Sequence, residues 1–389
     1  MKRRERISAT LKGCSVDRPA VSFYELNGLD EDPNDDDPFN IFSHPSWRSL
    51  IELTREKTDR IVMRGVPFKD APANKRTWNE INYDNPLFPE FTEIEKHIKN
   101  GSEFITRKIK CGSRTFTSRL RRDPDTNTVW ELEYFLKNTD DLRAWLELPE
   151  VEPCKEPDVS VVLETEEALG DTGIVMITTA DPLAQISFLL ELGELTIVAM
   201  TETELFHKVL EKAARRLYVE TEVVAKALPG RLWRIVGPEL ASPPFLPPHL
   251  FREYVTKYDR HMVDIIHKYG GFARIHSHGN LKEILDDIVA TGCMGLDPIE
   301  PPPQGDVELR YVRERYGNQL VLFGNLEVSD IENLPTDKFE EKVTRAISEG
   351  TSDTGRGFVL MPAACPYGRE LSSLTLKNYE KIIEVVEQL

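Results

Sequence analysis

Short apolar runs alternate with longer amphipathic stretches along most of this chain of 389 residues. Continuous apolar runs flanked by amphipathic segments are typical of strands in a parallel sheet that helices cover on both faces. The pattern predicts eight strands, at residues 19–24, 60–66, 173–179, 232–236, 272–276, 293–299, 320–324 and 357–361.

The stretches between the runs have the periodicity of helices. In residues 248–269, Tyr254, Tyr258 and Met262 belong to a set of apolar positions spaced close to the 3.6-residue period. Eight βα units in a single domain over residues 1–389 predict an α/β fold, the (β/α)8 or TIM barrel. A doubly wound sheet is the alternative, but no Gly-x-Gly-x-x-Gly motif follows a run, so a dinucleotide-binding crevice has no support.

Residues 104–136 interrupt this alternation. Three β-like segments, 104–110, 114–122 and 128–136, are separated by Cys111-Gly112 and by the polar residues 123–127. They predict an antiparallel β-ribbon, and an excursion of this kind can cap the mouth of a barrel.

Composition narrows the class of function. The chain has 49 Lys and Arg against 66 Asp and Glu, a net charge of −17, which argues against a nucleic-acid partner. Its most apolar stretch contains Glu191 and Glu194, too many charges for a membrane span. The basic N-terminus leads into no apolar stretch of the signal-peptide kind, and the five scattered cysteines favour a reducing compartment. We therefore expect a cytoplasmic protein that acts on a small molecule and has no membrane partner.

Polar residues follow several predicted strands, at the end of a (β/α)8 barrel where active sites lie. His276 and His278 close the fifth strand, Glu300 follows the sixth and Cys365 follows the eighth. Nitrogen, oxygen and sulfur donors suit zinc, and a catalytic zinc site keeps one position exchangeable. These four residues are the predicted metal ligands.

Each of the four also has a simpler interpretation. His276 can be a hydrogen-bonded barrel residue, and His278 can bind substrate or act as an acid or base. Cys365 can be a small buried residue, because free cysteine is among the most buried residue types. Glu300 can be a solvated loop acid. The residues by themselves leave these alternatives open.

Several segments together resemble the uroporphyrinogen decarboxylase superfamily. They are Arg4-Glu5-Arg6, Val16-Asp17-Arg18-Pro19, Gly237-Pro238-Glu239, residues 276–280 and Gly324-Asn325. The resemblance covers most of the chain, is strongest over residues 1–28 and 231–389, and implies a barrel.

The superfamily has two branches. True decarboxylases use no metal and carry the motif Met-Arg-Gln-Ala-Gly-Arg soon after the first strand, where this chain has Phe23-Tyr24-Glu25-Leu26-Asn27-Gly28. The acidic residues 30–37 that follow would repel a polyanionic tetrapyrrole. The chain therefore resembles more closely the second branch, the zinc-dependent methyltransferases that serve corrinoid proteins.

In that branch the zinc ligands follow the pattern His-x-Cys on one strand, Glu on the next strand and Cys near the end of the last strand. His276, Glu300 and Cys365 fall on these positions, whereas His278 stands where the family has Cys. An imidazole in place of a thiolate leaves more positive charge on zinc, which polarises a bound oxygen more strongly. We therefore hypothesise an oxygen substrate in place of the usual thiol.

The resemblance implies a zinc-dependent methyltransferase that moves a methyl group to or from a small O- or S-substrate. The corrinoid would come from a partner protein, and Glu239, Tyr24 and Asn325 would orient the substrate. The alternative is a metal-free decarboxylase in which His276 or His278 acts as a general acid. A barrel that binds a small ligand without catalysis is a third hypothesis.

Overall fold

Eight parallel strands form one sheet in this computed structural model, which describes residues 1–71, 93–111, 113–352 and 355–389. The order in the sheet is β1-β12-β11-β10-β9-β8-β7-β2, so barrel strands that follow one another along the chain are neighbours. This arrangement confirms the predicted α/β barrel. The strands are β1 (Ala20–Val21), β2 (Arg60–Arg64), β7 (Gly173–Ala180), β8 (Leu232–Val236), β9 (Phe272–His276), β10 (Gly295–Asp297), β11 (Val321–Leu326) and β12 (Phe358–Pro362).

The two end strands of this order, β1 and β2, meet through Asp59. Its backbone N–H donates to the carbonyl oxygen of Val21 at 2.6 Å, which brings the sheet close to a full barrel. The carboxylate of Asp59 is completely buried. It accepts hydrogen bonds from Arg6 at 2.5 Å, from Arg18 at 2.8 Å and from the N–H of Val21 at 2.9 Å. The hydrogen bonds of Asp59 thus link the two end strands of the sheet, where the barrel closes.

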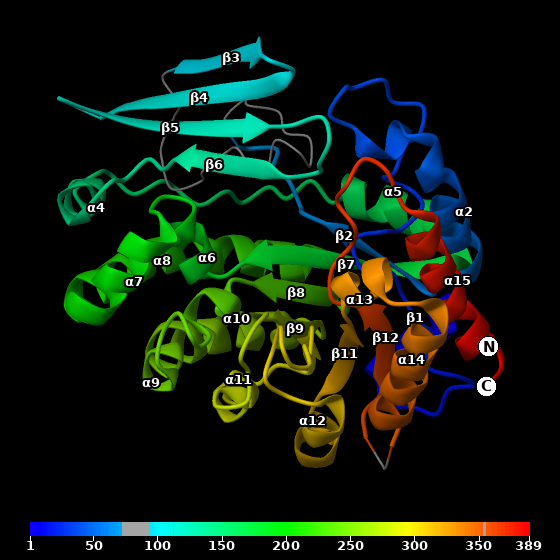
Figure 1. The fold of residues 1–389 in the computed structure, drawn as a ribbon. Helices are drawn as coiled ribbons and strands as arrows, with labels where there is room; N and C mark the ends of the chain where they lie inside the picture. Colours follow the sequence, from blue (N-terminus) through cyan, green and yellow to red (C-terminus); the bar gives the residue numbers. More distant parts are fainter. Residues whose placement is uncertain (72–92, 112, 353–354) are drawn as a thin grey trace.

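Helices surround the strands in Figure 1, as the periodicity predicts. In the described part of the chain, no helix is both long enough and apolar enough to cross a membrane. The helices are α1 (Arg3–Leu11), α2 (Arg48–Lys57), α4 (Thr139–Leu146), α5 (Ser160–Leu169), α6 (Pro182–Ser187), α7 (Leu192–Thr201), α8 (Thr203–Ala227), α9 (Pro248–Phe251), α10 (Lys257–Lys268), α11 (Leu285–Ala290), α12 (Leu309–Tyr316), α13 (Val328–Asn333), α14 (Thr336–Gly350) and α15 (Ser373–Glu387).

Helix α1 closes the amino-terminal end of the barrel. Its Ile7 and Leu11 join the buried cluster that fills the barrel interior, which includes Leu232, Phe323 and Met361. A much larger cluster packs the outer surface of the strands against the surrounding helices. The opposite, carboxyl-terminal end is therefore free of α1 and carries the loops that follow the strands.

A second, antiparallel sheet confirms the predicted excursion, but it is larger than the sequence indicated. It has the order β3 (Glu93–Lys99), β4 (Ser102–Cys111), β5 (Arg114–Arg122) and β6 (Val129–Glu133), so it begins at Glu93 and not at residue 104. Every residue of β3 is exposed, and its sequence is mostly polar. The strand therefore lacks the buried, apolar face that a sequence pattern detects. Gly112 lies outside the described residues.

The small sheet is attached to loops at the carboxyl-terminal end of the barrel. The N–H of Asn127 donates to Tyr367 at 2.8 Å, and the N–H of Leu136 donates to Leu189 at 2.9 Å. These two acceptors follow β12 and α6 in the chain. Figure 1 shows the sheet lying along one side of the barrel, over the segments that follow β7. The small antiparallel sheet thus lies beside the carboxyl-terminal end of the barrel, where the loops after the strands carry the predicted site residues.

Candidate active site

The seven residues that the sequence singled out all lie beyond or at the carboxyl ends of barrel strands. Tyr24 follows β1, Glu239 follows β8, and His278 follows β9. Glu300 and Cys365 follow β10 and β12. His276 is the last residue of β9, and Asn325 is the second-last residue of β11. The fold thus places these side chains around the end of the barrel where (β/α)8 enzymes hold their active sites.

A hydrogen-bonded pair joins two neighbouring strands at this end. Nδ1 of His278 lies 2.9 Å from Oε1 of Glu300, and the N–H of Gly279 donates to the other carboxylate oxygen at 2.8 Å. Burial opposes the charge on His278, but the hydrogen bond and negative charge of Glu300 outweigh it and raise the pKa of His278 above 6.5. Burial likewise opposes the charge on Glu300, and its bond to His278 still lowers the pKa. The contact thus favours the protonated imidazole of His278 beside the ionised carboxylate of Glu300, and the two groups can share a proton.

A second histidine pair lies deeper. Nδ1 of His276 is 2.9 Å from Asp297 Oδ2, and Arg274 Nε lies 2.8 Å from the other oxygen of the same carboxylate. All three side chains are buried. Burial, with the positive charge of Arg234 second, lowers the pKa of His276 to about 3. His276 is therefore neutral, and Asp297 fixes the orientation of its ring.

Aromatic contacts connect the two pairs to Tyr24. The His276 ring stacks on Tyr24 at 5.7 Å between ring centres and meets the His278 ring edge-on at 4.7 Å. The guanidinium of Arg234 lies 5.7 Å from the Tyr24 ring centre. The hydroxyl of Tyr24 is buried without a hydrogen-bond partner among the described residues, and burial raises its pKa. A phenol kept protonated in this way is a free hydrogen-bond donor for a bound molecule.

Glu239 and Asn325 complete the predicted substrate-orienting set. Glu239 accepts a hydrogen bond from the N–H of Gly237 at 3.0 Å, and burial raises the pKa of its carboxyl group. Asn325 is half-buried and pairs in register with Met361 of β12. Both residues are at the mouth, as expected from their strand positions, and their roles toward substrate stay predictions.

Cys365 differs from the other three predicted ligands. Its thiol is buried and donates to the carbonyl of Pro366 at 3.0 Å. Burial, with the negative charge of Glu25 second, raises the pKa of the thiol well above 9. The side chain is thus a protonated thiol, which would lose its proton on binding zinc as the thiolate.

The four predicted ligands stay a prediction, and the zinc site is not complete among the described residues. A catalytic zinc needs three protein ligands within about 2.3 Å of the metal. His278 contacts Glu300, and His276 binds Asp297 through Nδ1, which leaves its Nε2 as a possible ligand atom, as in many zinc-binding histidines. Cys365 is hydrogen-bonded to a backbone carbonyl. Within the described residues, no three His, Cys, Asp or Glu side chains form a group that could hold a metal ion.

Two further residues belong to this site and escaped the sequence analysis. Arg234 lies in the middle of β8, where a lone charge in an apolar run is easily taken as pointing outward. Glu327 follows β11 and is 4 % exposed, with Oε1 unpartnered among the described residues. Burial, with the charge of Glu300 second, raises the pKa of Glu327 to about 7. The signal available in the sequence was an acidic residue three positions after the seventh apolar run.

Comparison with known proteins adds a family and a fold. The sequence model of the family described as Uroporphyrinogen decarboxylase (URO-D) matches residues 143–379. A solved methyltransferase from Methanosarcina mazei is similar over 100% of this chain and 99% of its own, with a TM-score of 0.61 and 15% identity. A D-psicose 3-epimerase from Clostridium cellulolyticum H10 is similar over 60% of this chain and 94% of its own, with a TM-score of 0.33 and 10% identity. No curated protein sequence matches the chain.

Proposed function

This chain belongs to the uroporphyrinogen decarboxylase (URO-D) family, and we propose that within it the protein is a methyltransferase. It would move a methyl group between a small oxygen- or sulfur-bearing substrate and a corrinoid held by a separate protein in the cytoplasm. The similarity over the whole length of the Methanosarcina mazei methyltransferase supports this choice of reaction.

The observation that carries the proposal is the His278–Glu300 pair. It lies at the carboxyl-terminal end of the barrel, and the His278 side chain is 37% exposed, so a bound molecule can reach it. In methylation, the heteroatom of the substrate must lose a proton, and in demethylation the released heteroatom must gain one. A histidine and carboxylate that share one proton can carry out both transfers.

The surrounding residues would orient the substrate. Tyr24 offers a buried, unpartnered hydroxyl group, and the neutral ring of His276 stacks against it. The corrinoid, when bound, supplies the atom that gives or takes the methyl group. Zinc stays a prediction, because within the described residues no three of the four expected ligands form a group that could hold a metal ion. The proton transfer described here needs no other residue.

The metal-free decarboxylase is the second candidate, and a specific observation favours it. Because Glu300 raises the pKa of His278, this histidine can donate a proton, and decarboxylation also ends with protonation of a carbanion. Against it stands the acidic stretch of residues 30–37 in the loop after β1. It would oppose a substrate with several carboxylates.

One pair of assays separates the two functions. The protein is incubated with methylcobalamin and, in turn, with catechol and 2-mercaptoethanol, and loss of the methylcobalamin spectrum is followed. In parallel it is incubated with uroporphyrinogen and released CO2 is measured. The proposal predicts methylated acceptor and no CO2. Release of CO2 without methyl transfer would replace the proposal by the decarboxylase, and inactivity in both assays would contradict both.

A further inference from the structure

A cavity of about 260 Å³ opens at the amino-terminal end of the barrel, opposite the candidate active site. Its floor is formed by Ile174, Leu232 and Phe272, which lie at the second position of β7 and the first positions of β8 and β9. Leu232 is buried, whereas Ile174 and Phe272 are only partly covered. Helix α1 therefore covers this end of the barrel incompletely, and apolar surface stays accessible.

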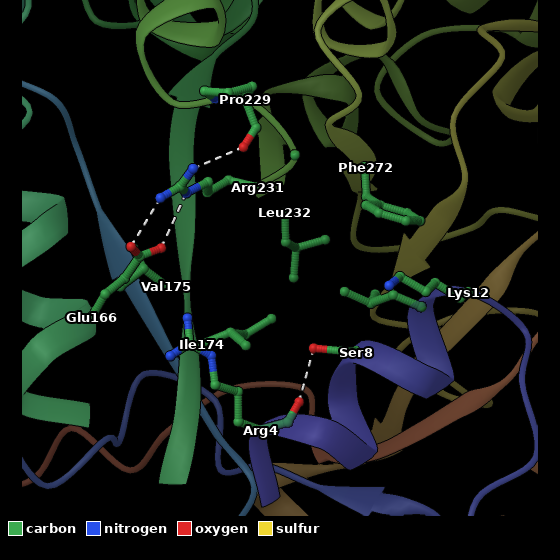
Figure 2. A pocket seen from close by; sticks show the side chains of 12 residues that line it. Arg4, Ser8, Lys12, Glu166, Ile174, Val175, Pro229, Arg231, Leu232 and Phe272 are labelled. Atoms are coloured by element: carbon green, nitrogen blue, oxygen red, sulfur yellow. Dashed lines mark hydrogen bonds and ion pairs between the residues drawn. The ribbon is translucent and has the colours of Figure 1, made fainter. Parts of the chain in front are cut away.

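One face of α1 forms the wall above this floor. Arg4, Ser8 and Lys12 line the cavity, and their spacing of four residues places them in a row along the helix. Figure 2 shows this row facing Leu232 and Phe272 across the opening. The cavity thus has an apolar side and a side with two cationic groups.

The charges on this wall are not balanced from within the cavity. Glu166 is the acidic residue in the lining, and Arg231 binds both of its carboxylate oxygens at 3.1 and 3.0 Å. Among the described residues, the hydrogen bond of the Arg4 guanidinium is a long one, to the carbonyl of Gly170 at 3.5 Å, and after the larger effect of Lys2 its charge lowers the pKa of Asp171. Asp171 is itself bound by Lys2 at 2.5 Å. In a chain with a net charge of −17, this cavity offers an excess of positive charge.

We propose that this cavity is a binding site for a small amphipathic anion, distinct from the active site. Its apolar body would lie on Leu232, Ile174 and Phe272, and its carboxylate would face Arg4 and Lys12. The volume admits an aromatic or short aliphatic carboxylate and excludes a tetrapyrrole. Because the ligand would join α1 to the strands β7, β8 and β9, its binding would stabilise the closure of the barrel.

The test uses benzoate as the probe and benzyl alcohol as its uncharged counterpart, titrated into the full-length protein and followed by ligand-detected NMR. Benzoate has about nine non-hydrogen atoms, and a ligand of this size should bind with a Kd of about 1 mM. Benzyl alcohol should bind at least about fivefold more weakly, because it lacks the charge that Arg4 and Lys12 attract.

Three variants locate the binding. Arg4→Gln combined with Lys12→Gln should weaken benzoate binding by about tenfold or more. Ser8→Phe should abolish it by filling the cavity from the α1 side. Lys226→Gln removes one charge from an exposed position on α8, outside the cavity, and should leave it unchanged.

Three results would overturn the site. They are no benzoate binding up to about 20 mM, equal affinity for benzoate and benzyl alcohol, and benzoate binding that survives Ser8→Phe. The last result would place the anion elsewhere on the protein. The comparison between benzoate and benzyl alcohol uses wild-type protein only, so it decides the charge preference even where a variant fails to fold.

Discussion

At the scale of single residues, contacts between strands decide the chemistry of the mouth. His276 and Asp297 are partners in the register of β9 and β10, and this alignment brings His278 to Glu300 two and three residues further on. The apolar runs predict which residues stand at the strand ends. They do not predict the register, so the pairing of the two histidines with two different acids could not be read from the sequence.

Cys365 gives a direct test of the predicted metal site. Its protonated thiol donates a hydrogen bond to the Pro366 carbonyl. Zinc content, measured by elemental analysis on protein without a histidine tag, is therefore expected to be the same in wild type and in Cys365→Ser. A fall in zinc on this replacement would show that the thiol turns into the mouth and binds the metal.

Glu327 predicts a dependence of stability on pH. Its ordinary pKa is 4.5 and its pKa in the folded protein is about 7, so between these values the folded state holds a proton that the unfolded chain has lost. Stability then falls as pH rises through this window. Glu327→Gln removes this loss and should raise the free energy of unfolding at about pH 8 by on the order of 1–3 kcal/mol.

Urea unfolding of wild type and Glu327→Gln at two pH values checks this effect. Below about pH 4.5 both folded and unfolded wild type hold the proton, so the two proteins should differ little there. A gain of the same size at both pH values would mean that the ionisation of Glu327 is not its cause.

At the scale of elements, apolar runs identify strands well when both faces are buried. All eight barrel strands coincide with predicted runs, because their side chains face either the barrel interior or the surrounding helices. Strand β3 has no such pattern, since each of its residues is exposed. It is a strand because its backbone pairs with β4. Its partner β4 follows after the two-residue turn Asn100-Gly101, in which both residues have positive φ, and this Asn-Gly hairpin signal is the local pattern that could have found the strand.

The junction of β1 and β2 predicts a large effect from one buried charge. Asp59→Asn would leave Arg6 and Arg18 without their shared carboxylate at the edge where the barrel closes. Breaking a buried ion pair costs about 3–5 kcal/mol, and we expect a loss of this size in the free energy of unfolding. Chemical denaturation measures it.

Lys57→Gln is the matched control for this prediction. It breaks the exposed ion pair between Lys57 and Glu387, which are 45% and 51% exposed. Exposed pairs contribute less than about 1 kcal/mol. If both replacements lowered stability equally, the carboxylate of Asp59 would not be what holds the barrel edge.

At the scale of the whole molecule, the barrel separates two different environments. The carboxyl-terminal end carries the His278–Glu300 and His276–Asp297 pairs beside the small sheet, and the amino-terminal end carries the cavity under α1. The family and barrel could be predicted from motifs spread over the sequence. The small sheet's attachment and the cavity could not, because both depend on contacts between segments far apart in the chain.

Methyl transfer itself tests the central claim most directly. The rate of methyl loss from methylcobalamin, in the presence of catechol or 2-mercaptoethanol, is measured for wild type, Glu300→Gln and the exposed control Glu308→Gln. Wild type and the control should transfer the methyl group at similar rates, and Glu300→Gln should be slower by about 10²–10⁴-fold because His278 loses its carboxylate partner. Absence of transfer by wild type, or an unchanged rate in Glu300→Gln, would contradict the proposed role of this pair.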